Sequence, residues 1–421
     1  MRGLIFSAPG SGSGKTTITL GVLRALTRRG TAVRAAKSGP DYIDPRFHEA
    51  ACGNACVNLD AWAMKKQRIR ALAQSEIPLI IEGAMGLFDG APPDGDGATA
   101  DLARILGLPV VLIVDASHMA QSIAAVVRGF SDHDPETRVM GVILNKVGSS
   151  RHERMLRRAL TPLGLPILGA VYRTQSITMP SRHLGLVQAA ENPDLNAFLD
   201  HAADVVEAAI DLDQLCELMR PLPVAPVSKK MPPPAQNIAI AHDAAFAFSY
   251  PHILGDWRQS GASLILFSPL NNEPVPDCDF VFLPGGYPEL HAAQLAQADR
   301  FLSSLINAAQ HSDIYGECGG YMVLGNSITD ADGNRHNMAG LLNLDTSFAS
   351  RKLHLGYRSL TPLGGVFSQP LNGHEFHYST ELFAQGDPLF KSKDAEGQSL
   401  PDMGLISGRV SGSYAHVIDV A

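Results

Sequence analysis

A regular alternation of short apolar runs with amphipathic segments constrains this chain more than any other feature. The apolar runs of the first half are typical of buried strands and cover residues 4–8, 32–36, 78–84, 109–116, 139–147 and 166–172. Helical patterns at 16–30 and 118–130 lie between them, and a longer one at 195–219 follows the last run. Because parallel strands need crossover connections, the alternation predicts an α/β fold with a parallel sheet flanked by helices.

A proline-rich stretch at 220–236 interrupts this alternation. Proline does not fit inside a helix or a central strand, so we expect a linker at 221–236 between one domain at 1–220 and another at 237–421. Strand-like runs resume at 237–243, 263–269, 279–286 and 313–317, and 288–310 has a helical pattern. The second domain is therefore also expected to be α/β, with strands and loops from about Gly340 onward.

The overall composition excludes several classes of protein. The chain has 421 residues, more than one hydrophobic core usually organises, and its net charge of -8 offers no basic surface for nucleic acid. No run approaches the roughly 18 apolar residues of a membrane span, and the N-terminus turns glycine-rich too early for a signal peptide. Five scattered cysteines fit a reducing compartment, so the expected location is cytoplasmic, away from membranes.

The stretch SAPGSGSGKTT follows the first expected strand and opens the first expected helix, which is where a phosphate-binding P-loop lies. Pro9 stands where the strict pattern has glycine, so the motif is a variant. Lys15 can reach terminal phosphates, Thr16 can offer its hydroxyl to Mg²⁺, and Thr17 completes the motif. Backbone N–H groups can converge on phosphate oxygens at three glycines, Gly10, Gly12 and Gly14. A glycine turn without a ligand is the weaker alternative.

Acidic side chains stand at the ends of two later strands, the edge of a parallel sheet where ligands bind. Asp41 and Glu82 are candidates for holding Mg²⁺, which prefers carboxylates together with phosphate oxygens. Asp44 and Asp89 could instead face a substrate. Asp-Pro and Asp-Gly are common turn formers, so a structural role is the alternative for this second pair.

The stretch LNKVG, at the end of another expected strand, matches part of the base-reading signature of GTP-binding proteins. Gly148 stands where that signature has the aspartate that reads guanine. The pattern therefore favours adenine, with Asn145 as a candidate contact to the nucleotide.

Cys318 lies between the expected strand DIYGE and a helical start in CGGYMVLG. Such a turn presents a side chain at the sheet edge, and a helix N-terminus lowers the pKa of a thiol toward the reactive thiolate. His416 is the expected base, and the backbone N–H groups of Gly286 and Gly319 could form an oxyanion hole. Asp419 is a candidate to orient the imidazole. The alternative for this cysteine is a buried structural thiol.

Two further clusters give only weak indications of a metal. Cys52 and Cys56 have no second cysteine pair, so zinc is not expected there. His374 and His377, in GHEFHYS, lack a clear third ligand, and a structural or substrate-facing role is expected instead.

Seven stretches taken together resemble a known family. They are APGSGSGKTT, KSGPDYIDP, EGAMGLFDG, LPGGYPE, YGECGGYMVLG, GHEFHYS and SYAHV, in this order over nearly the whole chain. They resemble the cobyrinic acid a,c-diamide synthases, which include the enzymes for hydrogenobyrinic acid. The resemblance implies a P-loop domain similar to dethiobiotin synthetase and a glutaminase domain similar to class I glutamine amidotransferases. It also implies amidation of the a and c acetate side chains of a corrinoid in cobalamin biosynthesis, with ATP, Mg²⁺ and glutamine.

The same resemblance assigns roles to matching residues. Cys318 would be the glutaminase nucleophile, His416 the histidine that activates it, and the loop around Lys15 the ATP site. Motifs associated with the corrinoid carboxylates and Mg²⁺ contain Tyr42, Asp44 and Asp89. The dethiobiotin synthetase fold often pairs, which suggests a homodimer by analogy.

Three positions depart from the usual family pattern. His242 and Gly316 stand where arginine and alanine are more common, away from the core chemistry. Ile418 stands where class I enzymes have a glutamate two residues after the histidine. A pair of cysteine and histidine is therefore expected rather than a full triad.

Two alternatives stay open at this point. The first is amidation of a related tetrapyrrole such as nickel sirohydrochlorin, or of other corrinoid side chains as in cobyric acid synthase. The second is a P-loop regulatory ATPase with an inactive amidotransferase domain. Such ATPases often have a second lysine early in the loop, where Gly10 stands here, and the presence of both Cys318 and His416 also disfavours this alternative.

Overall fold

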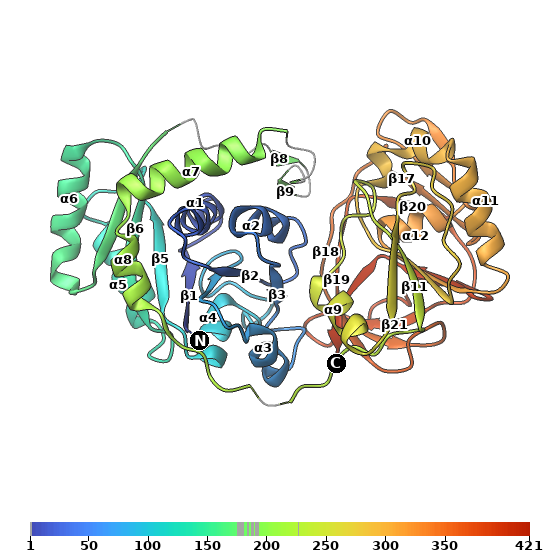
Figure 1. The fold of residues 1–421 in the computed structure, drawn as a ribbon, viewed down its shortest axis with the longest axis horizontal. Coiled ribbons are helices and arrows are strands. Elements are labelled where there is room, and N and C mark those ends of the chain that lie inside the picture. The colour runs from blue at the N-terminus through green and yellow to red at the C-terminus, as the bar shows by residue number, and fades with distance from the viewer. Residues whose placement is uncertain (1, 175–180, 183–184, 187–188, 190–192, 226) are drawn as a thin grey trace. The chain divides into compact units, whose positions relative to one another are not determined.

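The computed structural model describes residues 2–174, 181–182, 185–186, 189, 193–225 and 227–421. It divides into two compact units, Met1–Lys229 and Lys230–Ala421. Each unit combines a largely parallel sheet with helices, which confirms the predicted α/β class in both halves (Figure 1). Among the helices of the described residues, none has both the length and the apolar character needed to cross a membrane.

The main sheet of unit 1 has the strand order β3-β2-β4-β1-β5-β6-β7, and neighbouring strands on this path run parallel. A short strand β10 (Arg220–Pro221) pairs antiparallel with β1. The seven strands are Arg2–Ser7 (β1), Arg34–Ser38 (β2), Val57–Leu59 (β3), Leu79–Glu82 (β4), Val110–Asp115 (β5), Val139–Val147 (β6) and Ile167–Tyr172 (β7). The sequence predicted all of them except β3, whose 3 residues are too few to show a periodic pattern.

Helices surround this sheet, and in Figure 1 α1, α2 and α7 lie together on one side of β2 while α3 and α4 lie on the other. Their bounds are Lys15–Arg28 (α1), Asp44–Cys52 (α2), Lys66–Ala73 (α3), Thr99–Leu106 (α4), Ile123–Asp132 (α5), Ser150–Leu160 (α6), Leu195–Ala209 (α7) and Leu212–Leu218 (α8). The helical pattern expected at 195–219 is thus two helices. They separate because the Asp211 side chain caps α8, accepting a hydrogen bond from Gln214 N at 2.9 Å. Shorter elements are η1 (Thr161–Leu163), β8 (Ser181–Arg182) and β9 (Gly185–Leu186).

Unit 2 contains a sheet with the order β12-β11-β13-β14-β23-β22, parallel except for the last pair. Its strands are Asn237–Ala241 (β11), Ser263–Phe267 (β12), Phe280–Leu283 (β13), Asp313–Glu317 (β14), Leu405–Ser407 (β22) and Val410–Ser413 (β23). The helices are Pro251–Gln259 (α9), Pro288–Leu290 (η3), Ala292–Ala296 (α10), Asp299–Ala308 (α11) and Gly319–Leu324 (α12). The pattern at 288–310 is therefore three short helices.

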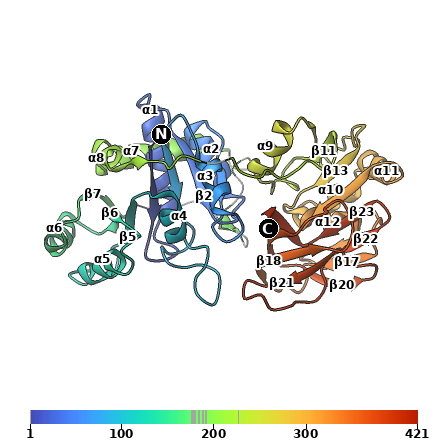
Figure 2. The same cartoon turned by 90° about the horizontal axis from the view of Figure 1, so that it is seen from below.

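Two four-stranded sheets make up the rest of unit 2, with the orders β16-β15-β17-β20 and β21-β18-β19-β24. Figure 2 shows β18, β20 and β21 gathered on one side of this unit, away from α9 and α11. The strands of the two four-stranded sheets are Ser327–Thr329 (β15), Arg335–Asn337 (β16), Leu344–Ser347 (β17), His354–Pro362 (β18), Leu371–His377 (β19), Thr380–Ala384 (β20), Phe390–Lys393 (β21) and Ala415–Val420 (β24). Strands and loops thus follow Gly340, as expected.

The proline-rich stretch has neither helix nor strand over residues 222–225 and 227–236. Its beginning is held within unit 1, because Gln74 Nε2 donates a hydrogen bond to the Pro223 carbonyl at 2.9 Å. Its end is held within unit 2, where the buried Met231 donates its backbone N–H to Asp256 Oδ2 at 2.8 Å.

Candidate functional sites

The glycine-rich loop lies at the carboxyl end of β1 and leads directly into α1. Gly14 caps the helix with a left-handed φ of 86°, and a Cβ at this position would lie only 2.2 Å from Asn145 Nδ2. Both the conformation and the close approach require glycine. The loop therefore has the shape that a P-loop needs, at the edge of the sheet where the sequence predicted it.

Two residues at the carboxyl end of β6 fix this loop. Asn145 Nδ2 donates to the Ser13 carbonyl at 2.9 Å, and Lys146 Nζ donates to the Gly12 carbonyl at 2.8 Å and to Asp115 Oδ2 at 2.6 Å. Lys146 has a positive φ of 56°, which side chains rarely adopt. Asn145 thus has a structural role that the sequence did not predict, and its contact with a nucleotide stays a prediction.

Lys15 is the first residue of α1 and is buried. Its Nζ donates to the Met85 carbonyl, and the Gly10 carbonyl lies 3.4 Å from it. Burial lowers the pKa of Lys15, and the charge of Glu82 partly opposes this shift. The chain after β4 also bonds to the residue that follows β1, because Leu87 N donates to the Ala8 carbonyl at 2.9 Å. Lys15 is therefore held between the glycine loop and the segment that follows β4.

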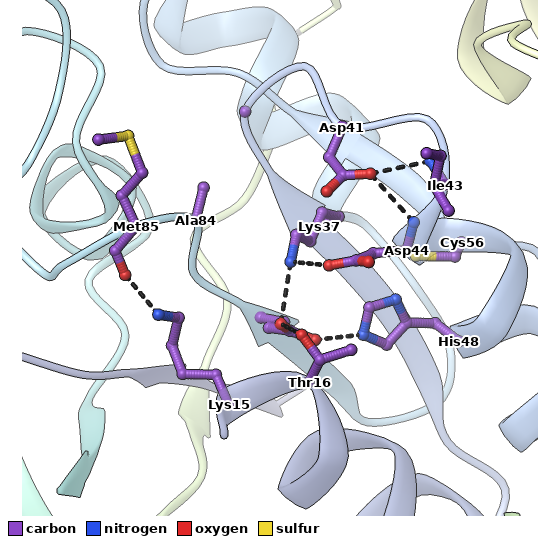
Figure 3. A network of polar contacts seen from close by, with 12 residues as sticks. Lys15, Thr16, Lys37, Asp41, Ile43, Asp44, His48, Cys56, Ala84 and Met85 are labelled. Atoms are coloured by element: carbon purple, nitrogen blue, oxygen red, sulfur yellow. Dashed lines mark hydrogen bonds and ion pairs between the residues drawn. The ribbon is translucent and has the colours of Figure 1, made fainter. Parts of the chain in front are cut away.

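A buried network of charged side chains lies beside the P-loop (Figure 3). Lys37 Nζ donates to Asp44 Oδ2 and, at 2.9 Å, to Glu82 Oε1. Glu82 also accepts a hydrogen bond from Thr16 Oγ1 at 2.6 Å, and its other oxygen lies 2.6 Å from His48 Nε2. The structure thus brings the predicted residues Thr16, Asp44 and Glu82 together around a lysine that the sequence did not single out.

Burial and charge compete in setting protonation within this network. Burial would raise the pKa of Glu82, but the charges of Lys37 and His48 outweigh it and hold this pKa well below its usual range. Burial, followed by the charge of Asp41, raises the pKa of Asp44 to about 6. Burial would lower the pKa of Lys37, but the carboxylates beside it raise it. Carboxylate oxygens thus lie beside the P-loop, and such oxygens are the ligands that Mg²⁺ prefers.

The other predicted residues of this site have local hydrogen-bonding partners. Asp41 Oδ1 accepts from Ile43 N at 2.8 Å and from Asp44 N at 3.0 Å, so it forms a turn before α2. Asp89 Oδ2 accepts from Gly86 N at 2.9 Å, which is the turn role considered for it from the sequence. Tyr42 is buried. Contacts of these three residues with a metal ion or a substrate stay predictions.

Lys37 and His48 are the functional candidates of unit 1 that the sequence analysis missed. Lys37 carried a signal, because it is a charged residue near the end of an otherwise apolar strand. His48 carried none, since a histidine in the middle of a helix is common.

In unit 2, Cys318 occupies the turn between β14 and α12, as predicted. Its φ of 46° and ψ of -103° lie in a region that residues with side chains rarely adopt. Its backbone N–H donates to the Ser413 carbonyl at 2.8 Å. Strain of this kind clusters at functional sites, which supports a role beyond packing.

The expected activation of the thiol by the helix start is wrong for this structure. Burial raises the pKa of Cys318 well above that of an ordinary thiol, and the nearby Glu289 adds to the shift. The backbone N–H of Gly319 opposes the shift only in part, and α12 has just 6 residues. The thiol therefore needs a separate proton acceptor.

His416 is fully buried on β24, opposite His374 of β19. A Cβ on Gly285 would lie 2.3 Å from His416 Cε1, and a Cβ on Gly319 would lie 3.1 Å from Gly286 N. The 285–286 segment is thus packed against both the imidazole and the residue after Cys318, and it brings the two predicted oxyanion groups together. Burial, and then His374, lower the pKa of His416 to about 3, so the imidazole is neutral and can accept a proton.

Glu317 is a polar residue of this site that the sequence analysis did not assign. Its Oε2 lies 3.8 Å from His416 Nδ1, and its Oε1 accepts from Val417 N at 3.0 Å. Burial raises the pKa of Glu317 to about 8. Asp419, the orienting residue suggested from the sequence, accepts from Val420 N at 2.8 Å, and its contribution to catalysis stays a prediction.

A third cluster in unit 2 contains His354, Glu375 and His377, whose nearest donor atoms lie within 4.8 Å of one another. Glu375 accepts from Arg358 Nε at 2.8 Å and lies 2.9 Å from His377 Nε2, while Ser379 Oγ lies 2.9 Å from His377 Nδ1. These internal hydrogen bonds fit the structural alternative for His377, and its role stays a prediction. All five cysteines lie in the described part of the chain and are free.

Two family models match the chain, one in each half. The CobQ/CobB/MinD/ParA nucleotide binding domain matches residues 4–187, and the CobB/CobQ-like glutamine amidotransferase domain matches residues 237–419. The P-loop thus lies in the part of the chain that matches a nucleotide binding family, and Cys318 lies in the part that matches a glutamine amidotransferase family.

Curated relatives match over the full length of the chain. A hydrogenobyrinate a,c-diamide synthase of Brucella anthropi is 53% identical and covers 100% of this chain and 99% of its own. Proteins of the same description from a Sinorhizobium species and from Mesorhizobium japonicum are 51% and 48% identical, with coverage of at least 98% of each chain.

Proposed function

The chain belongs to the hydrogenobyrinate a,c-diamide synthase family, and on this premise we propose that it amidates the a and c carboxylates of hydrogenobyrinic or cobyrinic acid in cobalamin biosynthesis. The reaction uses ATP, and its nitrogen comes from glutamine. The observation that carries the proposal is the presence of two complete but chemically different sites in one chain. One is a P-loop beside buried carboxylates, and the other is a buried Cys318 with an imidazole and converging backbone N–H groups.

The P-loop domain, at 1–220, activates the corrinoid carboxylate. A carboxylate is a poor acyl donor, so its oxygen attacks the γ-phosphorus of ATP, ADP leaves, and an acyl phosphate forms. Lys15 and the N–H groups of the glycine loop stabilise the charge on the transferring phosphoryl group. Ammonia then attacks the acyl carbon, phosphate leaves, and the amide remains.

Thr16, Glu82 and Asp41 are the residues proposed to hold Mg²⁺. When bound, the ion would supply positive charge for the phosphate oxygens. Substrate binding is assigned to Tyr42, Asp44 and Asp89. Asp44 suits a polycarboxylate, because a carboxyl group whose pKa is raised to about 6 can donate a hydrogen bond to a carboxylate near that pH.

The glutaminase domain, at 237–421, supplies ammonia. His416 accepts the thiol proton of Cys318, the sulfur attacks the side-chain amide carbon of glutamine, and the N–H groups of Gly286 and Gly319 stabilise the oxyanion. The proton passes to the leaving nitrogen, and a thioester forms. Water then hydrolyses the thioester to glutamate. A dedicated source is useful because free ammonia is mostly ammonium at neutral pH.

The place and assembly of the protein are also part of this proposal. Free cysteines support the cytoplasm as the place of action. A homodimer is proposed by analogy with the dethiobiotin synthetase fold, and light scattering of the purified protein tests it.

The decisive experiment separates the two half-reactions. Corrinoid diamide formation is measured with glutamine or with an ammonium salt, for the intact protein and for Cys318→Ala. The variant is expected to lose glutamine-dependent activity and to keep ammonium-dependent activity. Cys278→Ala is the matched control, because it removes another buried free cysteine of the same unit and should keep both activities. Equal glutamine use by Cys318→Ala would contradict the proposal.

The same assay tests the alternatives. A regulatory ATPase would hydrolyse ATP without any tetrapyrrole and form no amide, whereas the proposed ligase needs the corrinoid for sustained ATP turnover. Offering nickel sirohydrochlorin or corrinoids that already carry the a and c amides distinguishes the related amidation reactions. Preference for one of these over hydrogenobyrinic and cobyrinic acids would overturn the substrate assignment.

A further inference from the structure

The glutaminase chemistry proposed above has an electrostatic difficulty. Moving the thiol proton from Cys318 to His416 turns two neutral groups into an ion pair, and both groups are buried. Burial opposes each charge, because it raises the pKa of the thiol and lowers that of the imidazole to about 3. A negative group beside the imidazole would favour the proton transfer.

The charged groups near this pair come from several elements. His416 is influenced by His374 and His377, which oppose its protonation, and by Glu375, which favours it. The charges of Glu289, Glu375 and Glu317 all raise the pKa of Cys318. Glu375 is already hydrogen-bonded by Arg358 Nε at 2.8 Å and lies 2.9 Å from His377 Nε2, so its charge is largely balanced.

Glu317 differs from these groups in its geometry. It ends β14, where it pairs with Ser413 of β23, and it is 4% exposed. Its Oε1 is fixed by the Val417 N–H at 3.0 Å. This arrangement leaves Oε2 3.8 Å from His416 Nδ1. The residue directly before the nucleophile thus carries a carboxyl group next to the proposed base.

We propose that Glu317 is the positioning residue for His416 in the glutaminase half-reaction, a role that rests on the proposed function. In its ionised form Glu317 accepts a hydrogen bond from Nδ1–H once Oε2 closes in from the 3.8 Å of this structure, which leaves Nε2 without a proton and able to accept the one from Cys318. When the imidazolium forms, the carboxylate balances its charge, and the proton later leaves on ammonia. Glu317 thereby supplies the carboxylate that Ile418 lacks in the usual class I position.

Glu317→Gln tests this role with little change of shape, because the amide oxygen can still accept the bond from Val417 N. Glutamine-dependent amidation is expected to fall about 10- to 100-fold, as when a group that orients a catalytic or ligating histidine is lost. Ammonium-dependent amidation should stay within about twofold of the intact protein, since it bypasses unit 2 chemistry. Glu317→Asp keeps the charge and should recover part of the loss. Glu396→Gln, the same substitution at an exposed site of unit 2, should change neither activity.

A second measurement does not depend on turnover. The rate at which iodoacetamide alkylates Cys318 is followed against pH, with Cys318→Ala giving the background from the other cysteines. In Glu317→Gln the profile is expected to move upward by roughly one pH unit, because losing the carboxylate that balances the imidazolium outweighs losing its repulsion of the thiolate. A purely structural glutamate would not move this profile in a protein that keeps its ammonium-dependent activity.

The outcomes separate this inference from the proposed function. Unchanged glutamine use or an unchanged alkylation profile in Glu317→Gln would overturn the positioning role, and so would a shift that appears in Asp419→Asn instead. If Glu317→Gln also lost its ammonium-dependent activity, Glu317→Asp becomes the deciding variant. Full glutamine use and an unchanged pH profile of alkylation in Glu317→Asp would contradict the need for a carboxylate at this fixed position. Glutamine use by Cys318→Ala would instead refute the proposed function itself.

Discussion

The two candidate sites hold charge in opposite ways. The site in unit 1 is ionised, with Lys37 bonded to two carboxylates and Glu82 bonded to three partners. The site in unit 2 is neutral, because burial favours the thiol of Cys318, the uncharged imidazole of His416 and the protonated form of Glu317. Both sites are buried, so exposure to water does not explain the difference.

The difference follows the chemistry proposed for each site. Phosphoryl transfer begins with highly charged groups, and fixed charges can stabilise them without rearrangement. Amide cleavage begins with a neutral side chain of glutamine, and charge appears only during the reaction. A neutral, buried site makes each charge that appears interact strongly with its neighbours. The predictions below are arranged to test this contrast.

The largest effect is expected for Lys15→Ala. Loss of this ammonium should lower amidation by about 10³-fold from either nitrogen source, as for other removed groups that stabilise a transferring phosphoryl group. The measurement is the initial rate of diamide formation with glutamine and with ammonium. Lys391→Ala, on the surface of unit 2, serves as the control. Ammonium-driven amidation that survived in Lys15→Ala would refute the role of the P-loop.

Lys37→Met tests the ionised character of the first site. Removing this cation leaves Asp44 and Glu82 without their buried partner, which should cost about 3–5 kcal/mol of folding free energy. Urea unfolding measures the loss. Arg409→Met breaks a half-exposed ion pair with Asp313 and should change stability by less than about 1 kcal/mol. Equal losses of folding free energy in the two variants would show that Lys37 does not balance buried charge in unit 1.

Gly285→Ala tests the close packing of the neutral site. The added methyl group would meet the imidazole of His416 at 2.3 Å, so the ring must move. Glutamine-dependent amidation should fall by about 10²-fold, because small displacements of catalytic groups have effects of this size. Ammonium-dependent amidation should remain. Gly255→Ala is the matched control, since a Cβ there meets nothing within 4 Å.

The smallest effect concerns the pH dependence of stability, and its sign should differ between the sites. Glu317 has its pKa raised from 4.5 to about 8, so its contribution is complete below pH 4.5 and is lost as pH rises through 8. Glu82 has a lowered pKa, so its contribution is complete above its ordinary value of 4.5 and is lost as pH falls below it.

Urea unfolding of Glu317→Gln and Glu82→Gln at several pH values measures these contributions. Compared with the intact protein, Glu317→Gln should gain about 1 to 2 kcal/mol between pH 5 and pH 8. For Glu82→Gln, the deficit in unfolding free energy relative to the intact protein should become smaller as the pH falls toward 3. Slopes of the same sign for both variants would contradict the contrast.

Much of the architecture could be predicted from the sequence. Local backbone preferences are recorded directly in a linear sequence. They account for the strand and helix periods, for the proline-rich stretch, and for the succession of strand, glycine loop and helix around Lys15. Cys318 was located at its turn for the same reason. The missed β3 and the division of 288–310 into short helices show where elements are too short for a period to decide.

The partners within each site could not be predicted in the same way. Lys37, His48 and Glu82 lie on three different elements, and only the folded sheet brings them together. Glu317 approaches His416 across 99 positions of the chain because the sheets place β14 near β24. The pKa of Cys318 was wrongly expected to fall, since a helix start is visible in the sequence while the extent of burial is not.

The left-handed backbone at Cys318 has a consequence for protein engineering. Glycine would adopt this conformation without strain, and relief of about 1–3 kcal/mol is typical of such positions. A library sorted only for resistance to heat is therefore expected to enrich glycine at position 318 while the glutaminase is lost. Any search for more stable forms of this protein therefore needs a screen for glutamine-dependent amidation at the same time.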